Sequence, residues 1–482
     1  MEAFLHPLQG LAEFEEIKKR CGANCGILNV SGCMESQKVH LMYGLSGLFP
    51  YHLILADDER NAKEIYEDYR FYDKNVYFYP AKDLLFFQAD IHGNLLIRQR
   101  MRVIRALLEQ EEVTVVTSID GCMDFLMPLE KIRSRLLHFK SDSVIDLDQL
   151  KEELVELGYE RTGQVELPGQ FSVRGGIIDI YPLTEDNPWR IELWDDEVDS
   201  IRSFDAESQR SLENVDEITI YPAAEKMDGE DMVSFLDYFP EEKTLVFLDE
   251  LNHLAENGEG VEEEYRQSRM HREEKGEANL PEQWLCGFQE LQKKLNRRNC
   301  VAVSALSPRR SGWKINEEFD LTVKSVDSYN SSFELLVKDL LQYKSQGYRI
   351  ALLSGSRTRA ERLAKDLSEE GLNAFYSQDM DRIISPGEIM VVYGHARRGF
   401  QYPLIKFAVM TETDIFGKEQ KKRKKKKKYS GNRIQDFAEL SIGDLVVHEK
   451  HGLGIYRGIE KVEVDRVVKD YIKIEYRGGS NL

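Results

Sequence analysis

Short apolar segments alternate with helical patterns over the first 135 residues or so, and this alternation restricts the fold more than any other feature. Apolar segments at 27–30 and 51–56 each precede a helical pattern, and the segment at 113–118 follows a long amphipathic stretch. Strands that alternate with helices are typical of a parallel sheet with helices on its faces. The sequence therefore predicts an α/β layer at the start of the chain.

The pattern changes downstream, and 482 residues are too many for one hydrophobic core. Strand patterns with Gly and Pro turns at 139–222 predict an inserted α+β domain. We expect the following charge-rich stretch to be largely helical, apart from a strand at 244–249. The predicted organisation is 1–138, the first part of an α/β domain; 139–222, the insertion; 223–318, the second, helical part of the first domain; 319–416, a small α/β domain; 417–437, a basic linker; and 438–482, an incomplete β domain.

The linker differs from the rest of the chain in its charge. Residues 418–428 hold nine cations and one anion, whereas the whole chain has a net charge of −20. An acidic body suits protein partners better than DNA, because DNA-binding surfaces are strongly basic. One interpretation of the tract is an extended tether kept open by repulsion between like charges, and the other is weak, salt-sensitive DNA contact through Lys421–Lys428.

The composition does not predict export or membrane insertion. No uninterrupted apolar run approaches 18 residues, and the acidic, mixed N-terminus does not have the pattern of a leader. The six cysteines are sparse and do not have the spacing of zinc ligands. We therefore expect a cytoplasmic protein with free thiols, no metal site and no membrane contact.

A candidate phosphate-binding loop follows the first strand. Such a loop requires G-x-x-x-x-G-K-[ST], in which the second Gly lets the backbone approach the phosphates and the hydroxyl binds Mg²⁺. Gly32 and Lys38 have the required spacing, but Gln37 replaces the second glycine and Val39 has no hydroxyl. The sequence therefore predicts an inactive nucleotide site, in which Lys38 is an ordinary lysine on a helix surface.

Two acidic residues follow the apolar strand at 244–249. Asp249 and Glu250 have the position of residues that hold magnesium in nucleotide hydrolases. Without a working phosphate loop they have no nucleotide to serve, so we expect a solvated strand end.

The stretch around 165–211 contains a candidate protein interface. On the strand at 189–194, Arg190 and Trp194 share one face, and Arg174 precedes a Gly-Gly bend that could aim its side chain. Arg and Trp on a solvent-facing surface are typical anchors of protein interfaces. The alternative is local, with Arg190 paired to Glu192 or Asp195 and Trp194 covering the edge of the core.

Three segments resemble bacterial transcription-repair coupling factors, and the resemblance extends over essentially all 482 residues in matching order. It is strongest in VRGGIIDIYP (173–182), RIELWDDEVDSIRSFDAESQRS (190–211) and GDLVVHEKHGLGIYRGIEKVEVDRVVKDYIKIEY (443–476). The resemblance implies a UvrB-like module with a degenerate RecA-like, P-loop-type domain. It also implies a C-terminal SH3/Tudor-like β-barrel similar to that of CarD-type factors.

The resemblance also implies partners. The residues that bind UvrA in this family fall on Arg174, Arg190 and Trp194, and the apolar contact to the RNA polymerase β subunit falls on Val462. The resemblance thus implies a protein interface at Arg190 and Trp194, in place of local pairing by Arg190 and covering of the core edge by Trp194.

The motor of the family, with its intact phosphate loop, has no counterpart in the sequence, so we expect a truncated chain. Residues 1–482 are then not an enzyme: catalytic residues are absent, and ATP and Mg²⁺ belong to the missing motor, which would also make the main DNA contact. The whole protein would use ATP to displace stalled polymerase and bring in excision repair. Two other functions stay open, an ATP-dependent damage-verification protein of the UvrB type and a CarD-type transcription regulator.

Overall fold

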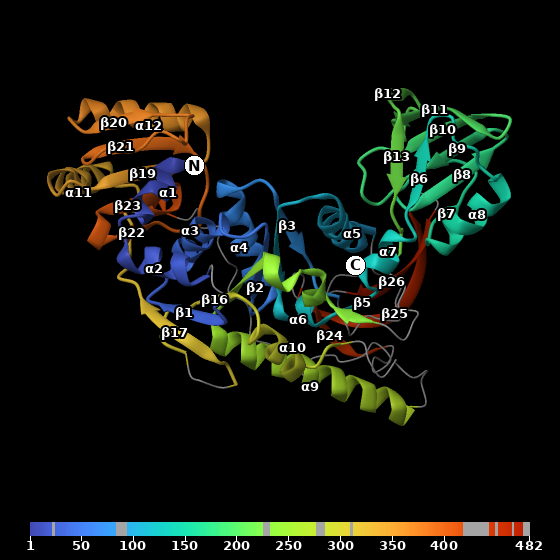
Figure 1. Ribbon diagram of the computed structural model, residues 1–482, viewed down its shortest axis with the longest axis horizontal. Helices are drawn as coiled ribbons and strands as arrows, with labels where there is room; N and C mark the ends of the chain where they lie inside the picture. Colours follow the sequence, from blue (N-terminus) through green and yellow to red (C-terminus); the bar gives the residue numbers. More distant parts are fainter. Residues whose placement is uncertain are drawn as a thin grey trace.

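The computed structural model describes residues 1–21, 25–82, 94–224, 232–275, 285–308, 312–417, 443–448, 452–464 and 467–475. In Figure 1 a central α/β body lies between two smaller units, with residues 319–416 at one end and the inserted domain at the other. The basic tract 418–428 and most of the predicted linker lie outside the described residues.

The body is built on a seven-stranded parallel sheet of order β17-β1-β16-β15-β2-β4-β3. Most of its strands are buried on both faces, as expected when helices cover a parallel sheet. The strands are β1 (Ile27–Ser31), β2 (Tyr51–Ala56), β3 (Val76–Tyr79), β4 (Val113–Ser118), β15 (Thr244–Asp249), β16 (Cys300–Val303) and β17 (Ile315–Asp320). The predicted parallel α/β layer is thus confirmed.

Helices cover the sheet of the body, and α4 begins at a residue that caps it. The Asp58 side chain accepts a hydrogen bond from the Asn61 N–H at the start of this helix. The helices are α1 (Glu2–Leu8), α2 (Ala12–Cys21), α3 (Glu35–Ser46), α4 (Glu59–Tyr72), α5 (Asn94–Glu109), α6 (Ile119–Met123), α7 (Leu129–Arg133), α9 (Leu251–Lys275) and α10 (Phe288–Leu295).

The expectation for 223–320 is confirmed for the helices α9 and α10, but the expectation of a single strand in this stretch is wrong. Besides β15, this stretch supplies β16 and the edge strand β17 to the main sheet. Their short length concealed them, because four to six residues show little periodicity. The minor elements are β5 (Phe125–Leu126) paired with β14 (Val233–Ser234), and the 3₁₀ turns η2 (Phe235–Tyr238) and η3 (Glu241–Lys243).

The inserted domain is a six-stranded sheet of order β12-β11-β10-β9-β8-β7, antiparallel except where β7 meets β8. Helix α8 (Leu147–Glu156) precedes it, and β6 (Leu137–Lys140) pairs with β13 (Glu217–Ile220) where the chain enters and leaves. The strands are β7 (Glu160–Arg161), β8 (Gln170–Arg174), β9 (Ile177–Ile180), β10 (Trp189–Trp194), β11 (Glu197–Phe204) and β12 (Ser211–Val215). Its alternating strands bury Ile178 and Ile191 on one face.

Within the predicted 319–416 domain a second sheet has the order β18-β22-β23-β19-β21-β20, in which β23, β19, β21 and β20 are parallel, whereas residues 319 and 320 end β17 of the body sheet. Its elements are β18 (Lys324–Ser325), α11 (Phe333–Ser345), β19 (Arg349–Ser354), α12 (Arg357–Glu369), β20 (Asn373–Tyr376), β21 (Glu388–Tyr393), β22 (Phe400–Tyr402), η4 (Pro403–Ile405), β23 (Phe407–Thr411) and α13 (Glu412–Phe416). This is the second α/β unit that the sequence predicted.

The C-terminal strands form an antiparallel sheet of order β24-β25-β26. They are β24 (Leu445–His448), β25 (Gly452–Val464) and β26 (Val467–Glu475). β24 pairs with the first residues of β25, whereas β26 pairs along the strand as far as Val464. Across the described residues, no helix is long and apolar enough to cross a bilayer.

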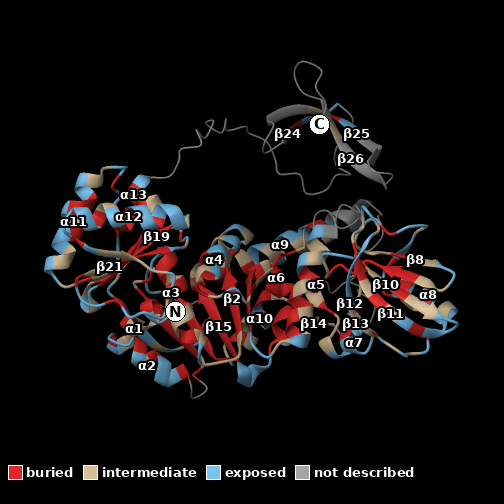
Figure 2. Cartoon of the chain, turned by 90° about the horizontal axis from the view of Figure 1, so that it is seen from above, coloured by how far each residue is buried: buried red, intermediate tan, exposed pale blue. Residues whose placement is uncertain are grey.

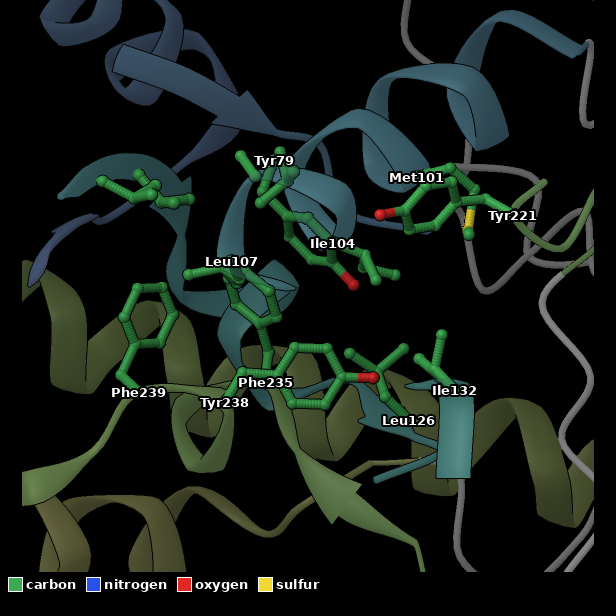
Figure 3. Packing of buried hydrophobic residues seen from close by; sticks show 14 of the residues in the cluster. Tyr79, Met101, Ile104, Leu107, Leu126, Ile132, Tyr221, Phe235, Tyr238 and Phe239 are labelled. Atoms are coloured by element: carbon green, nitrogen blue, oxygen red, sulfur yellow. The ribbon is translucent and has the colours of Figure 1, made fainter. Parts of the chain in front are cut away.

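Buried residues fill the interior of the body sheet, of the inserted sheet and of the sheet at 324–411, as Figure 2 shows. One aromatic cluster joins the body sheet to the segment that returns from the inserted domain (Figure 3). Tyr79 stacks on Phe235 with ring centres 3.7 Å apart, and Phe239 meets Phe235 edge-on at 5.5 Å. Aromatic contacts of this kind add to the free energy gained from burial, so they help to fix where the insertion leaves the body.

Candidate functional site

The loop between β1 and α3 is too short to hold a phosphate, and its backbone N–H groups already donate hydrogen bonds within the protein. Only residues 32–34 separate the strand from the helix. The N–H groups of Gly32 and Cys33 donate to the carbonyls of Ala305 (3.3 Å) and Ser304 (3.1 Å). Phosphate binding requires such N–H groups to be free and directed at the ligand. Gly32 has φ +76° and a Cβ there would lie 2.1 Å from the Leu321 carbonyl oxygen, so glycine is required for packing.

Gln37 fills the place where a phosphate loop has glycine. Its side chain is fully buried. Its Oε1 accepts the N–H of Met34 at 3.0 Å, and its Nε2 donates to the hydroxyl of Tyr402 at 3.0 Å. The same hydroxyl lies 3.1 Å from Nδ1 of His40. The start of α3 is therefore bonded to β22 of the 319–416 domain.

Lys38 is not the surface lysine that the sequence predicted. Its Nζ lies 2.6 Å from Asp249 Oδ1 and 2.6 Å from Glu250 Oε1, and its side chain is only 12% exposed. Burial alone would lower the pKa of Lys38, but the two carboxylates outweigh burial and raise that pKa. The lysine is therefore held as a cation by its neighbours.

The expected solvated strand end at Asp249 and Glu250 is also wrong. Asp249 is buried, and its second oxygen accepts the side-chain N–H of Asn61 at 2.7 Å. Burial raises the pKa of Asp249, although Lys38 opposes this effect. Val39 is fully buried and supplies no oxygen for a metal. The described residues contain no group of three or more His, Cys, Asp or Glu side chains arranged to hold a metal ion.

The 319–416 domain is also joined to this end of the body by charged groups. Arg397 donates through Nε to Asp68 Oδ2 at 2.9 Å and through its backbone N–H to Asp68 Oδ1 at 3.0 Å. Ser36, in the first turn of α3, donates to the same carboxylate at 2.8 Å and accepts the N–H of Arg398 at 3.1 Å. The predicted nucleotide site is thus a joint between two domains.

A polar cluster lies on the inserted domain, on the face opposite its core. Asp179 of β9 stands opposite Arg190 of β10 and Ser172 of β8, so the three share one face of the sheet. Asp179 is fully buried, and both of its oxygens accept hydrogen bonds from arginines. The structure therefore brings Arg174 and Arg190 together on one carboxylate.

Arg190 is the more enclosed of the two arginines, with 13% of its side chain exposed. Its Nε and Nη2 donate to Asp179 at 2.6 and 2.9 Å, and Nη2 also donates to Gln209 at 3.0 Å. The guanidinium lies 4.2 Å from the ring centre of Phe204. The hydrogen bonds with Asp179 raise the pKa of Arg190, although burial opposes the effect. The predicted pairing with Glu192 or Asp195 is wrong: Glu192 pairs with Arg202.

Arg174 and Trp194 form the exposed part of this face. Arg174 donates from Nη2 to Asp179 at 2.6 Å, and 43% of its side chain is exposed. The Gly175-Gly176 turn that follows has positive φ only at Gly175, as in a type II′ hairpin. The N–H of Leu193 donates to the Gly176 carbonyl at 2.8 Å, which brings Trp194 beside this turn.

Trp194 is 80% exposed, so the interpretation that it covers the edge of the core is wrong. We refer to Arg174, Asp179, Arg190 and Trp194 as the Arg/Trp face. Asp179 was not among the predicted site residues, although its position between Ile178 and Ile180 in a short strand places it on the face opposite the core.

Val462, the predicted contact with polymerase, lies in β25 opposite Lys469 of β26. Its strand neighbours from Ile459 to Val464 pair with β26, and β24 pairs nearer the start of β25. Lys421–Lys428, the alternative DNA contact, lie outside the described residues.

Comparison with known proteins gives two domain matches and a set of relatives. Residues 137–225 match the UvrB interaction domain and residues 440–482 match the CarD-like/TRCF RID domain. A transcription-repair-coupling factor of Bacillus subtilis (strain 168) is 29% identical, over 94% of this chain and 45% of the relative. Proteins of the same name from Staphylococcus aureus (strain MRSA252) and Staphylococcus epidermidis (strain ATCC 12228 / FDA PCI 1200) are 27% and 28% identical, over 85% and 89% of this chain.

The chain spans less than half the length of these relatives, 45%, 40% and 42% respectively. The Arg/Trp face lies within the segment matched by the UvrB interaction domain, and Val462 lies within the other matched segment. The predicted resemblance is confirmed: the chain is similar to transcription-repair-coupling factors over nearly all of its own length and matches the two domain models.

Proposed function

We propose that this chain is the recruitment and docking part of a transcription-repair coupling factor. In this proposal the Arg/Trp face of the inserted domain binds UvrA, and the C-terminal strands bind the RNA polymerase β subunit. The observation that carries the proposal is the geometry of that face, where two arginines share one buried carboxylate beside a tryptophan that is 80% exposed.

The chemistry of the Arg/Trp face suits protein recognition. An exposed tryptophan can fill an apolar pocket on a partner and release its ordered water. The half-exposed Arg174 can donate to a carboxylate or carbonyl beside that pocket. Arg and Trp are the residue types whose truncation most often costs more than about 2 kcal/mol of binding energy.

Binding of purified UvrA to the 482-residue chain tests the first contact. We expect Trp194→Ala and Arg174→Ala each to weaken binding by about tenfold or more, which corresponds to the loss of an interface anchor. The matched control is Arg98→Ala, because Arg98 pairs with Asp186 in the loop at the other end of β9 and β10. UvrA binding that is unchanged in both face variants would count against the proposal.

The second contact relies on strand addition. The residues from Ile459 to Val464 pair with β26 on one side, and none of the described strands pairs with their other side. An edge of this kind can accept a strand of a partner through backbone hydrogen bonds. We expect Val462→Arg to abolish polymerase binding. Glu463→Arg is the control, since it introduces the same side chain at the next residue of the strand. Equal binding by the two variants would contradict this contact.

The remaining parts of the proposal follow the same resemblance. Residues 1–138 and 223–318 would be a RecA-like domain without a working nucleotide site, and 438–482 would be part of an SH3/Tudor-like barrel. The whole protein would be a cytoplasmic, ATP-dependent DNA translocase that displaces stalled polymerase, and its ATP and Mg²⁺ would bind outside residues 1–482.

Two assays separate this proposal from its alternatives. A UvrB-type verification enzyme would hydrolyse ATP and lose this activity in Lys38→Ala, whereas we expect no turnover by the chain. A CarD-type regulator that uses Lys421–Lys428 on DNA would bind duplex strongly and in a salt-dependent way. We expect weak duplex binding in comparison with UvrA binding, since the chain carries a net charge of −20.

A further inference from the structure

Asp179 has a charged side chain on the same face of the sheet as the proposed UvrA contacts. It is buried, so UvrA cannot touch it. It is fully buried, although Arg174, Arg190 and Trp194 on the same face have exposed fractions of 43%, 13% and 80%. Its Oδ1 accepts from Arg190, and its Oδ2 accepts from both Arg190 and Arg174. Because Oδ2 serves both, the two guanidinium groups are neighbours.

The two arginines differ in how firmly they are held. Arg190 is fixed from three directions, by Asp179, by Gln209 at 3.0 Å and by the ring of Phe204 at 4.2 Å. Gln209 is itself placed by hydrogen bonding of its Nε2 to the Ala206 carbonyl at 2.8 Å. Of these groups Arg174 contacts only Asp179, to which it donates one hydrogen bond from Nη2 at 2.6 Å. Rotation of the Arg174 side chain is therefore limited by the carboxylate, while the rest of its guanidinium faces solvent.

Electrostatics gives the carboxylate a second effect. Two neighbouring guanidinium groups repel each other, and one carboxylate between them reduces this repulsion and leaves one net positive charge. Without the Asp179 carboxylate, the Arg174 side chain would be free to turn away from Arg190. It would then also turn away from Trp194, which lies beside the Gly175-Gly176 turn. A long side chain that is ordered before binding loses less rotamer entropy on binding, which is worth about 0.5–1.5 kcal/mol for each such side chain in general.

We propose that Asp179 is the positioning residue of the Arg/Trp face, which holds Arg174 and Arg190 in the arrangement that UvrA recognises. This inference rests on the proposed function of the face. It assigns different tasks to the two arginines. Arg174 and Trp194 touch the partner, and Arg190 acts mainly by completing the cluster that orders Arg174.

The test is the affinity of purified UvrA for the full 482-residue chain carrying Asp179→Asn. Asparagine keeps the shape of the side chain but removes its charge, so it cannot neutralise two arginines. We expect binding to weaken by about tenfold or more even though residue 179 cannot contact UvrA. The control for stability is Ile178→Ala, which removes a fully buried neighbour on the opposite face of the same strand. We expect this control to lower the thermal midpoint and to leave UvrA affinity within about twofold of the unsubstituted chain.

A double-mutant comparison adds a result that simple destabilisation cannot produce. Arg174→Lys keeps the charge but cannot share the carboxylate as a planar guanidinium does, so it retains part of the affinity. If Asp179 acts by positioning Arg174, the fold-loss caused by Asp179→Asn is at least about threefold smaller in the Arg174→Lys background than in the unsubstituted chain. If Asp179→Asn reduces the affinity for UvrA by the same factor in the Arg174→Lys background and in the unsubstituted chain, the inference is overturned. An unchanged affinity in Asp179→Asn would also overturn it.

The possible failures can be told apart. If the unsubstituted chain does not bind UvrA, the proposed function itself is wrong. If it binds UvrA and Arg174→Ala weakens binding while Asp179→Asn does not, the face is correct and only the positioning role of Asp179 is wrong.

Discussion

Lys38 illustrates how one residue can keep the position of a nucleotide-binding lysine and serve another purpose. A phosphate-loop lysine reaches toward the terminal phosphates of a nucleotide. Here two carboxylates, both 2.6 Å from Nζ, take the place of such an anion. The two carboxylates accept hydrogen bonds from the buried lysine, and the lysine compensates the negative charges of Asp249 and Glu250.

Lys38→Ala should destabilise the body, because it leaves two neighbouring carboxylates without a cation, one of them buried. Removal of one partner from a buried ion pair costs about 3–5 kcal/mol. A urea titration followed by circular dichroism measures the change in the free energy of unfolding. Lys63→Ala is the control, since Lys63 is exposed and pairs with Glu59 along α4, where a pair is worth less than about 1 kcal/mol. Equal denaturation midpoints for the two variants would contradict the structural role of Lys38.

Two histidines make stability depend on pH. Burial lowers the pKa of His40 and of His52 to about 4, from an ordinary value near 6.5. Between these values the unfolded chain binds protons that the folded chain does not, so the free energy of unfolding falls as the pH is lowered from about 6.5 to about 4. Each histidine accounts for a loss of about 3 kcal/mol at most.

The variant His40→Gln tests this prediction. Glutamine can still hydrogen-bond but does not titrate, so the slope of the unfolding free energy against pH should decrease in this window. Urea midpoints measured at several pH values between 4 and 7 provide the comparison. An identical slope in the variant and the unsubstituted chain would show that His40 binds its proton equally in both states.

At the scale of elements, the junction of β1 and α3 explains the inactive nucleotide site better than the two replaced residues do. The helix begins at Glu35, after a connection of three residues. The Gly32 N–H donates to the Ala305 carbonyl, and the Cys33 N–H donates to the Ser304 carbonyl. A loop that wraps a phosphate needs a longer connection with N–H groups turned inward. The missing glycine and hydroxyl are therefore only part of the reason.

Restoring the motif should then fail to restore binding. We expect Gln37→Gly combined with Val39→Thr to show no saturable binding of a fluorescent ATP analogue at millimolar concentration. The same change should lower stability, because it removes the hydrogen bonds of Gln37 with Met34 and Tyr402. Micromolar binding of the analogue by this variant would mean that residue identity, and not the short connection, blocks the site.

At the scale of the whole molecule, the 319–416 domain is attached to the body by a shared hydrophobic core and by polar groups at the start of α3. Asp68 receives Arg397 twice and Ser36 once, and Tyr402 links Gln37 to His40. Buried polar networks of this kind fix one relative placement of two elements, because a shifted placement would leave polar groups unsatisfied. The joint therefore couples the body and the third domain.

Asp68→Ala should weaken this joint. The change leaves Ser36 without its acceptor and Arg397 with Glu64 as its remaining ion-pair partner, while the hydrophobic core that the two domains share stays in place. We therefore expect a lower midpoint of thermal unfolding in calorimetry. Arg359→Ala is the control, because its pair with Glu412 lies within the 319–416 domain and Arg359 is largely exposed. Equal midpoints for the two variants would contradict the role of Asp68 in the joint.

Much of the fold followed from local patterns. The segments at 27–30, 51–56 and 113–118 were predicted as strands of a parallel layer and are strands of one parallel sheet. A bend was predicted at Gly175-Gly176, and the structure has a hairpin turn there between β8 and β9. The strands β16 and β17 were missed because one is a buried strand of only four residues and the other is a short, polar edge strand in a charge-rich stretch, and both carry little signal.

The candidate sites were predictable only as residue types. Arg174, Arg190 and Trp194 could be selected from the sequence, but the neighbours first considered for Arg190 were those closest in sequence, and its true partner Asp179 is eleven positions away on the adjacent strand. Register decides such pairs, because strands place directly opposite residues side by side.

The sequence by itself determined the alternation of strands and helices in the first part of the chain, the resemblance to transcription-repair-coupling factors and the loss of the residues that a phosphate loop requires. Periodicity and motifs are local properties, so they can be read along the chain. Only the tertiary structure decided that Lys38 is neutralised by residues 211 and 212 positions away, that Gln37 bonds to a residue 365 positions away, and that Asp179 unites two arginines. The physical reason is that burial and charge compensation depend on neighbours in space, and folding brings these together from distant parts of the chain.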